Sequence, residues 1–234
     1  MPDDIMNERL DQTTDARPGV RARHETMHKE IRNRISLLAY PPGMRLSETE
    51  LAQEFGTSRT PLRRVLARLE DEGLLKSVHG VGTFVTNVEI GELEQVYRLR
   101  LELVDLAAKL DPVLPDQAFM DRLDELIFRS AKMAHTEDPQ AFTRLDMDVF
   151  HTLLDLTDNE PLRKVMERLY YQTKRIWLKS AISSQLDLKE EYRIFHRELE
   201  DMKEALLIED LDAAAHIQRA HISMSFKRLL RKKA

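Results

Sequence analysis

The sequence contains no cysteine, few aromatic residues and no long apolar run. Without cysteine, the chain cannot form disulfide bonds or thiolate metal sites, which fits a reducing compartment. No stretch approaches the roughly 20 consecutive apolar residues that a membrane helix needs. The start of the chain is acidic and polar, which is not typical of a secretory signal. We therefore expect a cytoplasmic protein that makes no contact with a membrane.

Glycine is also scarce, and none of the seven glycines follows Gly91. A glycine-rich loop that binds phosphate is therefore excluded from the larger part of the chain. Leu, Ala and Met carry most of the 42% hydrophobic fraction, and this mixture favours helices over strands. The 234 residues are enough for one large domain or two small ones.

Charge is distributed unevenly along the chain. The net charge is -5, yet residues 20–86 carry eleven Lys or Arg against eight Asp or Glu. This segment is therefore at +3 and the remainder at -8. An acidic total does not exclude DNA binding, because only the surface that docks on DNA needs to be positive.

The basic segment has the pattern of a helix-turn-helix. Residues 24–39 carry apolar residues at spacings of three and four, which predicts an amphipathic helix. Ser47 and Glu50 form a capping box for a second helix, and Gly56 ends it. A third helix is predicted at 58–72, where apolar residues again recur on one face. Two short helices joined by a tight turn are the outline of this DNA-binding motif.

Two short strands are predicted after the third helix, at 74–78 and 83–86, joined by a glycine-containing loop. This hairpin would be the wing of a winged helix-turn-helix domain over residues 21–86. Residues 1–20 lack an apolar period, and we interpret them as a flexible arm.

The third predicted helix is rich in arginine, and no acidic residue occurs between Phe55 and Leu69. Arg59 and Arg63 share a face near its start, where base contacts arise in this motif. An arginine that bonds a guanine edge bidentately contributes about 1–3 kcal/mol of discrimination. A solvated basic surface is the alternative, but the capping box, the turn and the wing in register favour DNA.

Neighbouring side chains have supporting roles. The hydroxyls of Ser58 and Thr60, with the free amides of the first turn, suit phosphate oxygens. Arg64 and Arg68 are expected on the far side of the helix, where they would meet solvent or glutamate.

The rest of the chain predicts helices only. We place a linker at 87–91 and an all-helical domain at 92–230, so the fold class is mostly α. The breaks at Pro112, Pro115, Pro139 and Pro161 separate the elements. The predicted helices are 90–110, 116–135, 139–156, 161–180, 186–207 and 211–230.

The N-terminal segment resembles the GntR family of bacterial regulators over residues 24–86. The matching stretches are 41–48, 58–63 and 69–75. The resemblance implies that the arginines at 59 and 63 contact bases, that phosphates are held by residues 45 and 58, and that the wing tip enters the minor groove. Arg64 stands where many relatives have an acidic residue. The DNA-contacting residues that we predict are Arg45, Thr49, Ser58, Arg59, Thr60, Arg63, Arg64, His79 and Gly80.

The helical domain resembles FCD, the effector domain of the FadR-like subgroup. The matching stretches are 96–100, 149–151, 158–162 and 205–222. The resemblance implies a small-molecule pocket and the main dimer contact. Arg100 matches an arginine that faces the pocket in relatives, and a guanidinium suits a carboxylate, so we expect an organic acid. A helix-surface ion pair is the alternative role of this arginine.

The resemblance also raises the question of a metal. Family members often bind zinc, nickel or manganese through one Asp and three His. Here His151 and His221 match two ligand positions, whereas Met147 and Leu199 occupy the other two. Asp148 would share a helix face with His151, whereas Asp146 should point elsewhere. His196 lies one turn before Leu199. We favour a site without metal, in which residues 100, 151 and 221 bind the effector.

These observations predict a homodimeric repressor that binds a palindromic operator and responds to a small effector. The Leu-rich segments 101–110 and 162–178 would form either the dimer contact or the core. Two alternatives remain. One is a metal-dependent helical enzyme that uses Asp148, His151 and His221, and the other is a DNA-architectural protein without an effector.

Overall fold

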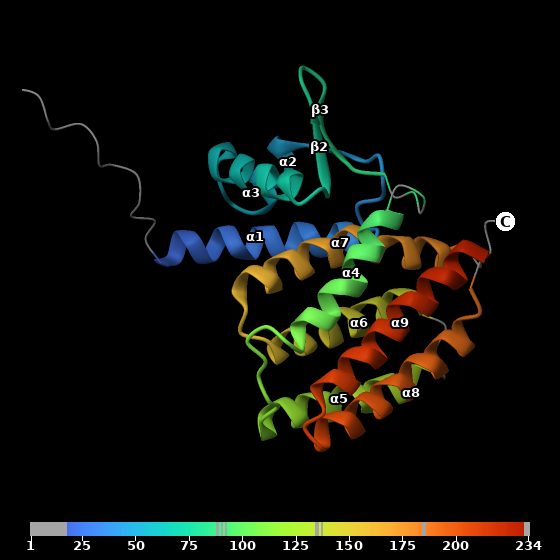
Figure 1. Ribbon diagram of the computed structural model, residues 1–234. Coiled ribbons are helices and arrows are strands. Elements are labelled where there is room, and N and C mark those ends of the chain that lie inside the picture. Colours follow the sequence, from blue (N-terminus) through green and yellow to red (C-terminus); the bar gives the residue numbers. More distant parts are fainter. Residues whose placement is uncertain are drawn as a thin grey trace, which may run out of the picture.

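The computed structural model describes residues 18–231 except 88, 90, 92, 134, 135, 137, 184 and 185, and its fold is mostly α, as predicted (Figure 1). Residues 1–17 of the predicted flexible arm lie outside the described residues. Residues 18–20 belong to the first helix, which starts six residues earlier than its apolar period indicated. Within the described ranges, every helix is too short or too polar to span a membrane.

The N-terminal part is a winged helix-turn-helix, which confirms the prediction. Its elements are α1 (Pro18–Ser36), β1 (Arg45–Leu46), α2 (Glu48–Glu54), α3 (Arg59–Asp71), β2 (Leu75–Val78) and β3 (Gly82–Val85). The sheet order is β1-β3-β2, with both pairings antiparallel, so the wing has one strand more than the predicted hairpin. A two-residue strand is too short to show an alternating pattern, which is why the sequence did not indicate β1.

Local chemistry explains these elements. The Ser47 hydroxyl caps α2 by accepting a hydrogen bond from the amide of Glu50. Gly56 and Gly73 follow α2 and α3 with positive φ angles of 58° and 81°, which favour glycine. One face of α3 is buried because its apolar residues repeat at helical spacing. These residues are Leu62, Val65, Leu66 and Leu69.

In the C-terminal part, the described residues form six α-helices arranged in a ring. They are α4 (Glu94–Ala107), α5 (Gln117–Met133), α6 (Pro139–Leu153), α7 (Glu160–Ile182), α8 (Leu188–Leu207) and α9 (Leu211–Arg231), with a short 3-10 turn, η1 (Leu154–Leu156), after α6. Asp138, Asn159 and Asp187 cap α6, α7 and α8. Each helix packs against two neighbours in the order α4, α9, α8, α5, α6, α7 and back to α4.

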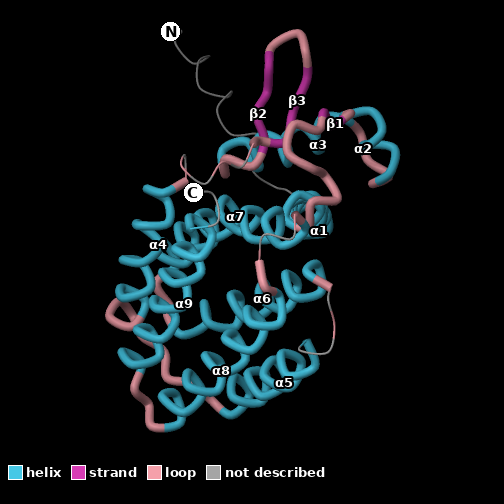
Figure 2. Tube along the Cα trace, turned by 90° about the vertical axis from the view of Figure 1, so that its right-hand side faces the viewer, coloured by secondary structure: helices cyan, strands magenta, loops and turns pink. Residues whose placement is uncertain are grey.

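The two parts meet where α1 lies along α7. Figures 1 and 2 show the winged domain over this end of the ring, with the wing pointing away from it and with α5 and α8 farthest from it. The Leu-rich segment 162–178 belongs to α7, and its leucines 162, 169 and 178 are buried in the core. On α4, Leu103 and Val104 are buried, whereas Leu99 and Leu106 are exposed.

Candidate functional site

The base-reading candidates lie on the surface of α3. The side chains of Arg59 and Arg63 are 57% and 58% exposed. Both bond the same oxygen of Glu48 on α2, at 3.0 Å from Nη2 of Arg59 and 2.8 Å from Nε of Arg63. Burial alone would raise the pKa of Glu48, but the bonds and charges of the two arginines lower it below the usual value. One carboxylate between two guanidinium groups leaves this face positive.

The Glu48 pairing does not close the surface to a nucleic acid. Exposed ion pairs contribute about 0–1 kcal/mol, so a phosphate or a guanine edge can replace the carboxylate. Arg64 is also exposed, and no ion pair within the described ranges includes it. Arg68 faces α1 and pairs with Glu25 and Glu72, as its predicted position on the far side of the helix indicated.

The remaining DNA-contact candidates surround this face. Ser58 is the N-cap residue of α3, and its side chain makes no capping hydrogen bond, so its hydroxyl is available. The Arg45 side chain lies across Gly82, where an added Cβ would be 2.7 Å from Nε. All the predicted residues are exposed: Arg45, Thr49, Ser58, Arg59, Thr60, Arg63, Arg64, His79 and Gly80. Their contacts with DNA remain a prediction.

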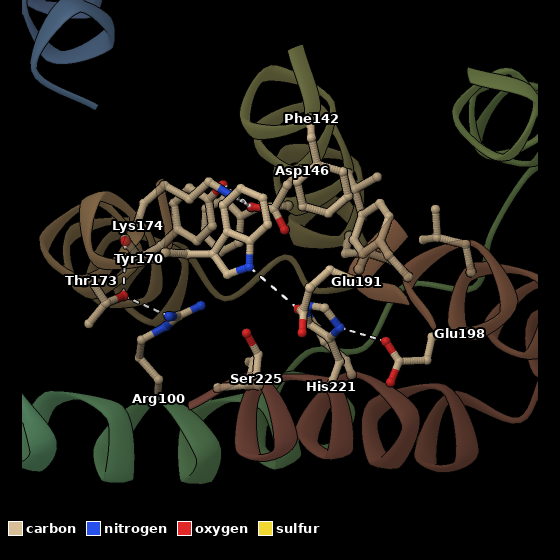
Figure 3. A pocket seen from close by; sticks show the side chains of 18 of the residues that line it. Arg100, Phe142, Asp146, Tyr170, Thr173, Lys174, Glu191, Glu198, His221 and Ser225 are labelled. Atoms are coloured by element: carbon tan, nitrogen blue, oxygen red, sulfur yellow. Dashed lines mark hydrogen bonds and ion pairs between the residues drawn. The ribbon is translucent and has the colours of Figure 1, made fainter. Parts of the chain in front are cut away.

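A pocket lies inside the helical ring, between α4, α6, α7, α8 and α9 (Figure 3). Its empty volume, counted with the space open to solvent, is about 860 Å³. Small-molecule sites commonly combine apolar walls with a few polar groups. The aromatic part of the wall consists of Tyr97, Phe142, Phe150, Tyr170, Trp177 and Phe195.

Arg100 reaches this pocket from α4. Its Nη1 donates a 2.6 Å hydrogen bond to Oγ1 of Thr173 on α7. The guanidinium carbon lies 5.6 Å from the ring centre of Tyr97 and 5.4 Å from that of Tyr170. None of the ion pairs found in the described part of the chain includes Arg100. Its positive charge therefore has no protein carboxylate beside it.

Asp146 also lines the pocket, on a different face of α6 from His151, as its spacing from that histidine indicated. Its Oδ2 pairs with the ammonium of Lys174 and accepts a 2.6 Å bond from the Tyr170 hydroxyl. Burial alone would raise the pKa of Asp146, but Lys174 and His221 hold it below the usual value. Lys174, the second cation of the pocket, is therefore neutralised by a carboxylate of the protein.

Two further carboxylates line the α8 side of the pocket. Glu198 Oε2 accepts a 2.6 Å bond from Nδ1 of His221. Glu191 accepts a 3.0 Å bond from Nη2 of Arg228 and faces the indole nitrogen of Trp177. Of the three histidines predicted near an effector or a metal, only His221 contributes to this pocket.

The predicted ligand set Asp148, His151, His196 and His221 is not brought together. Asp148 is exposed and pairs with Arg129, while His151 bonds the Tyr171 hydroxyl at 2.8 Å outside the pocket. His196 bonds Ser130 on α5. The part of the chain that the structure describes has no group of three or more potential ligands that could hold a metal. In the pocket, Asp146 is paired with Lys174 and Glu198 with His221, so these groups are already engaged within the protein.

The face of α6 explains this correction. Asp146, Val149, Phe150 and Leu153 recur at spacings of three and four and line the pocket together. Residues 148 and 151 therefore point in other directions, and Phe150 takes the place expected for His151. This spacing is visible in the sequence, whereas the resemblance implies a pocket position for His151.

The sequence also did not indicate the contacts between the two domains. On α7, Nε2 of Gln172 donates to the Glu72 carbonyl at 2.7 Å. Arg175, which is 1% exposed, donates to the carbonyl and hydroxyl of Thr86 after the wing, both at 2.9 Å. Burial lowers the pKa of Arg175 to about 10, so it remains a cation at neutral pH. These pairs are 89 and 100 residues apart in the sequence, so no local pattern predicts them.

Comparisons with known proteins match the same two parts. The model of "Bacterial regulatory proteins, gntR family" matches residues 24–85, and that of the FCD domain matches residues 95–224. An uncharacterized HTH-type transcriptional regulator, YdhC of Bacillus subtilis (strain 168), is 29% identical over 61% of the chain. That match covers 64% of the relative, less than two thirds of its length.

Two other similar proteins match over greater lengths. The fatty acid metabolism regulator protein of Shewanella sp. (strain MR-7) is 31% identical over 74% of the chain and 77% of its own length. The solved structure of E. coli McbR/YncC has a TM-score of 0.77 and 19% identity, and the match covers 91% of this chain and 99% of that one. At this identity the structural similarity concerns the fold.

Proposed function

This chain belongs to the GntR family of bacterial regulatory proteins and has an FCD domain, and we propose that it is a ligand-responsive repressor. In this proposal it binds a palindromic operator as a homodimer in the cytoplasm. A small organic acid in the helical domain releases or re-orients it. The family consists of transcriptional regulators rather than enzymes, which argues against the enzyme alternative.

The observation that carries this proposal is the exposed, positive face of α3. Arg59 and Arg63 share one carboxylate, so the pair keeps a net positive charge. The opposite face of the helix is buried, so α3 has a fixed orientation when the protein docks. A helix of this kind reads bases in the major groove, while hydroxyls and the wing hold the phosphate backbone.

The pocket supports an effector role and argues against a purely architectural protein. An architectural protein has no use for a pocket with an unpaired arginine. An organic acid would place its carboxylate against Arg100, and the bidentate bond would be strong because both groups are charged. The Thr173 hydroxyl, which Arg100 contacts at 2.6 Å, is the partner that the effector replaces or shares.

Helix α7 offers a direct route from the pocket to DNA. Thr173 and Lys174 face the pocket, whereas Gln172 and Arg175 hold the winged domain. A change in how Arg100 engages Thr173 shifts α7 relative to α4, and the same helix then moves the contacts at Thr86. An effector acts in this way only if it binds one arrangement better than the other.

The dimer contact is proposed at α4. Leu99 and Leu106 are 47% and 38% exposed and lie two turns apart on one face. Leu110, which lies just after the end of α4, is also exposed. Exposed apolar residues at this spacing suit contact with a second copy of the same helix.

The DNA-reading role is tested by selecting the preferred site from random duplexes and then measuring affinities. Arg63→Ala should weaken binding to the selected site about tenfold or more, because a bidentate base contact contributes about 1–3 kcal/mol. The preference for the selected site over random DNA should fall, and one base position should become degenerate. Fluorescence anisotropy at fixed salt measures both affinities.

Arg68→Ala is the matched control, because Arg68 is on the same helix but faces α1. It should leave the preference between the two DNAs nearly unchanged. Equal losses on selected and random DNA for Arg63→Ala would contradict the base-reading role.

A further inference from the structure

The pocket has opposite hydrogen-bonding demands at its two ends. We infer that the effector carries one carboxylate and, at its other end, a hydrogen-bond donor, namely an ammonium or a hydroxyl group. This inference rests on the proposed function, since it specifies the ligand of the proposed effector pocket. It follows from the groups that the protein leaves without partners.

The donor end of the pocket is Arg100. One of its nitrogens donates a hydrogen bond to Thr173. A guanidinium has five N–H donors in a planar fork, so others remain for a ligand. Lys174 is not available in the same way, because Asp146 already neutralises it. The pocket therefore has one unpaired cation among the described residues, which matches one carboxylate.

The acceptor end is the Glu198 and His221 pair. Glu198 is only 7% exposed, and its Oε1 is buried without any hydrogen-bond partner in the described part of the protein. Nδ1 of His221 donates to the other oxygen of this carboxylate, so Oε1 is the acceptor that the pair leaves open. A buried carboxylate oxygen without a donor is unfavourable, and a ligand donor would satisfy it.

The two ends are separated across the pocket. Figure 3 shows Arg100 at one end and Glu198 at the other, with Ser225 and His221 between them. Aromatic side chains, including Phe142 and Phe150, also line the pocket. A ligand with an apolar chain between two polar ends therefore matches this lining.

The charge balance excludes two simpler ligands as the best fit. A dicarboxylate would place its second anion beside Glu191 and Glu198, where like charges repel. A simple fatty acid would satisfy Arg100 but leave Oε1 of Glu198 without a donor. An amino acid or hydroxy acid with terminal groups satisfies both ends.

The test is a matched series of straight-chain acids of four to eight carbons, titrated calorimetrically into the full-length protein. At each length the ω-amino acid and the ω-hydroxy acid are compared with the monocarboxylic acid and the dicarboxylic acid. For six carbons these are 6-aminohexanoate, 6-hydroxyhexanoate, hexanoate and hexanedioate. At the best length, the amino or hydroxy acid should bind about tenfold more tightly than the other two, because a hydrogen bond to a charged group is strong.

Two variants test which residue binds each end of the ligand. Glu198→Gln should remove the advantage of the amino acid over hexanoate, and Arg100→Gln should weaken every acid. Arg98→Gln is the control, because Arg98 is exposed on the same helix and pairs with Glu94. Circular dichroism melting checks that each variant is folded, and the comparison of acids on the unaltered protein does not depend on any variant.

The outcomes separate the inference from the proposed function. If the ω-amino acid and the ω-hydroxy acid bind no more tightly than the monocarboxylic acid at every length, the two-ended pocket is overturned, even if acids bind and alter operator affinity. Tight binding of the bifunctional acid without any change in operator affinity supports the pocket chemistry and contradicts the effector role. Failure of every acid in the series to bind overturns both.

Discussion

At the scale of single residues, Glu48 is the acidic group nearest to the proposed base-reading arginines. Its Oε2 accepts bonds from Arg59 and Arg63, while its backbone belongs to the first turn of α2. It therefore has two opposite effects on DNA binding. Its charge repels phosphates, but its hydrogen bonds hold the two guanidinium groups in fixed positions.

Glu48→Gln should increase the affinity for random DNA severalfold, because a negative charge beside two cations is removed. The affinity for the selected operator should rise less, since the amide holds the guanidinium groups less firmly. The ratio between the two affinities is the decisive quantity, measured by anisotropy at two salt concentrations. Glu50→Gln, an exposed acid on the same helix, is the control for charge alone. A specificity ratio that rises would contradict this role of Glu48.

Residue-scale prediction from the sequence succeeded on α3 and failed on α6. On α3 the apolar stripe and the charged residues gave the same orientation, so Arg59 and Arg63 were placed correctly at the surface. On α6 the histidine at 151 was assigned to the pocket by resemblance. A change of one residue rotates a side chain by about 100° around the helix, which is enough to exchange Phe150 for His151.

At the scale of elements, most helices could be predicted because their ends carry local signals. The proline and capping residues at 138–139 and 159–161 place the starts of α6 and α7 within one residue of the prediction. The order in which the helices close into a ring has no such signal. Contacts such as Arg175 with Thr86 depend on tertiary packing.

Helix α7 combines pocket residues and domain contacts, so its junction should control communication between the two sites. Arg175→Met would keep the volume of the buried side chain but lose both bonds to Thr86. A bound acid should then change the operator affinity little or not at all. The affinity for the acid itself should stay within about threefold of that of the unaltered protein. Coupling between sites is typically 5–150-fold in affinity, so its loss is measurable.

The measurement is operator anisotropy with and without saturating 6-aminohexanoate or the tightest-binding acid of the series. Arg168→Met is the control, because Arg168 is exposed on the same helix. Coupling that persists in Arg175→Met at its original size would contradict a route through this contact.

At the scale of the whole molecule, the ring gives the chain two separate apolar surfaces. The inner surface forms the core and the pocket, and the buried leucines of α7 belong to it. The outer surface of α4 keeps exposed leucines although its inner face is buried. The sequence left both segments open as core or dimer contact, because an apolar stripe does not reveal which surface it meets.

Replacing Leu99 and Leu106 together by Glu should convert a dimer into monomers, because two buried negative charges per copy would oppose each other across the symmetric contact. Sedimentation equilibrium measures the mass, and operator affinity should fall toward that of a single half-site, since only a dimer holds two recognition helices at once. Leu207→Glu is the control, because this leucine is 57% exposed on α8, a helix that is not part of the proposed contact. A double variant that stays dimeric would place the dimer contact on another face, whereas a monomer that still binds the full operator tightly would contradict the two-fold mode of DNA recognition.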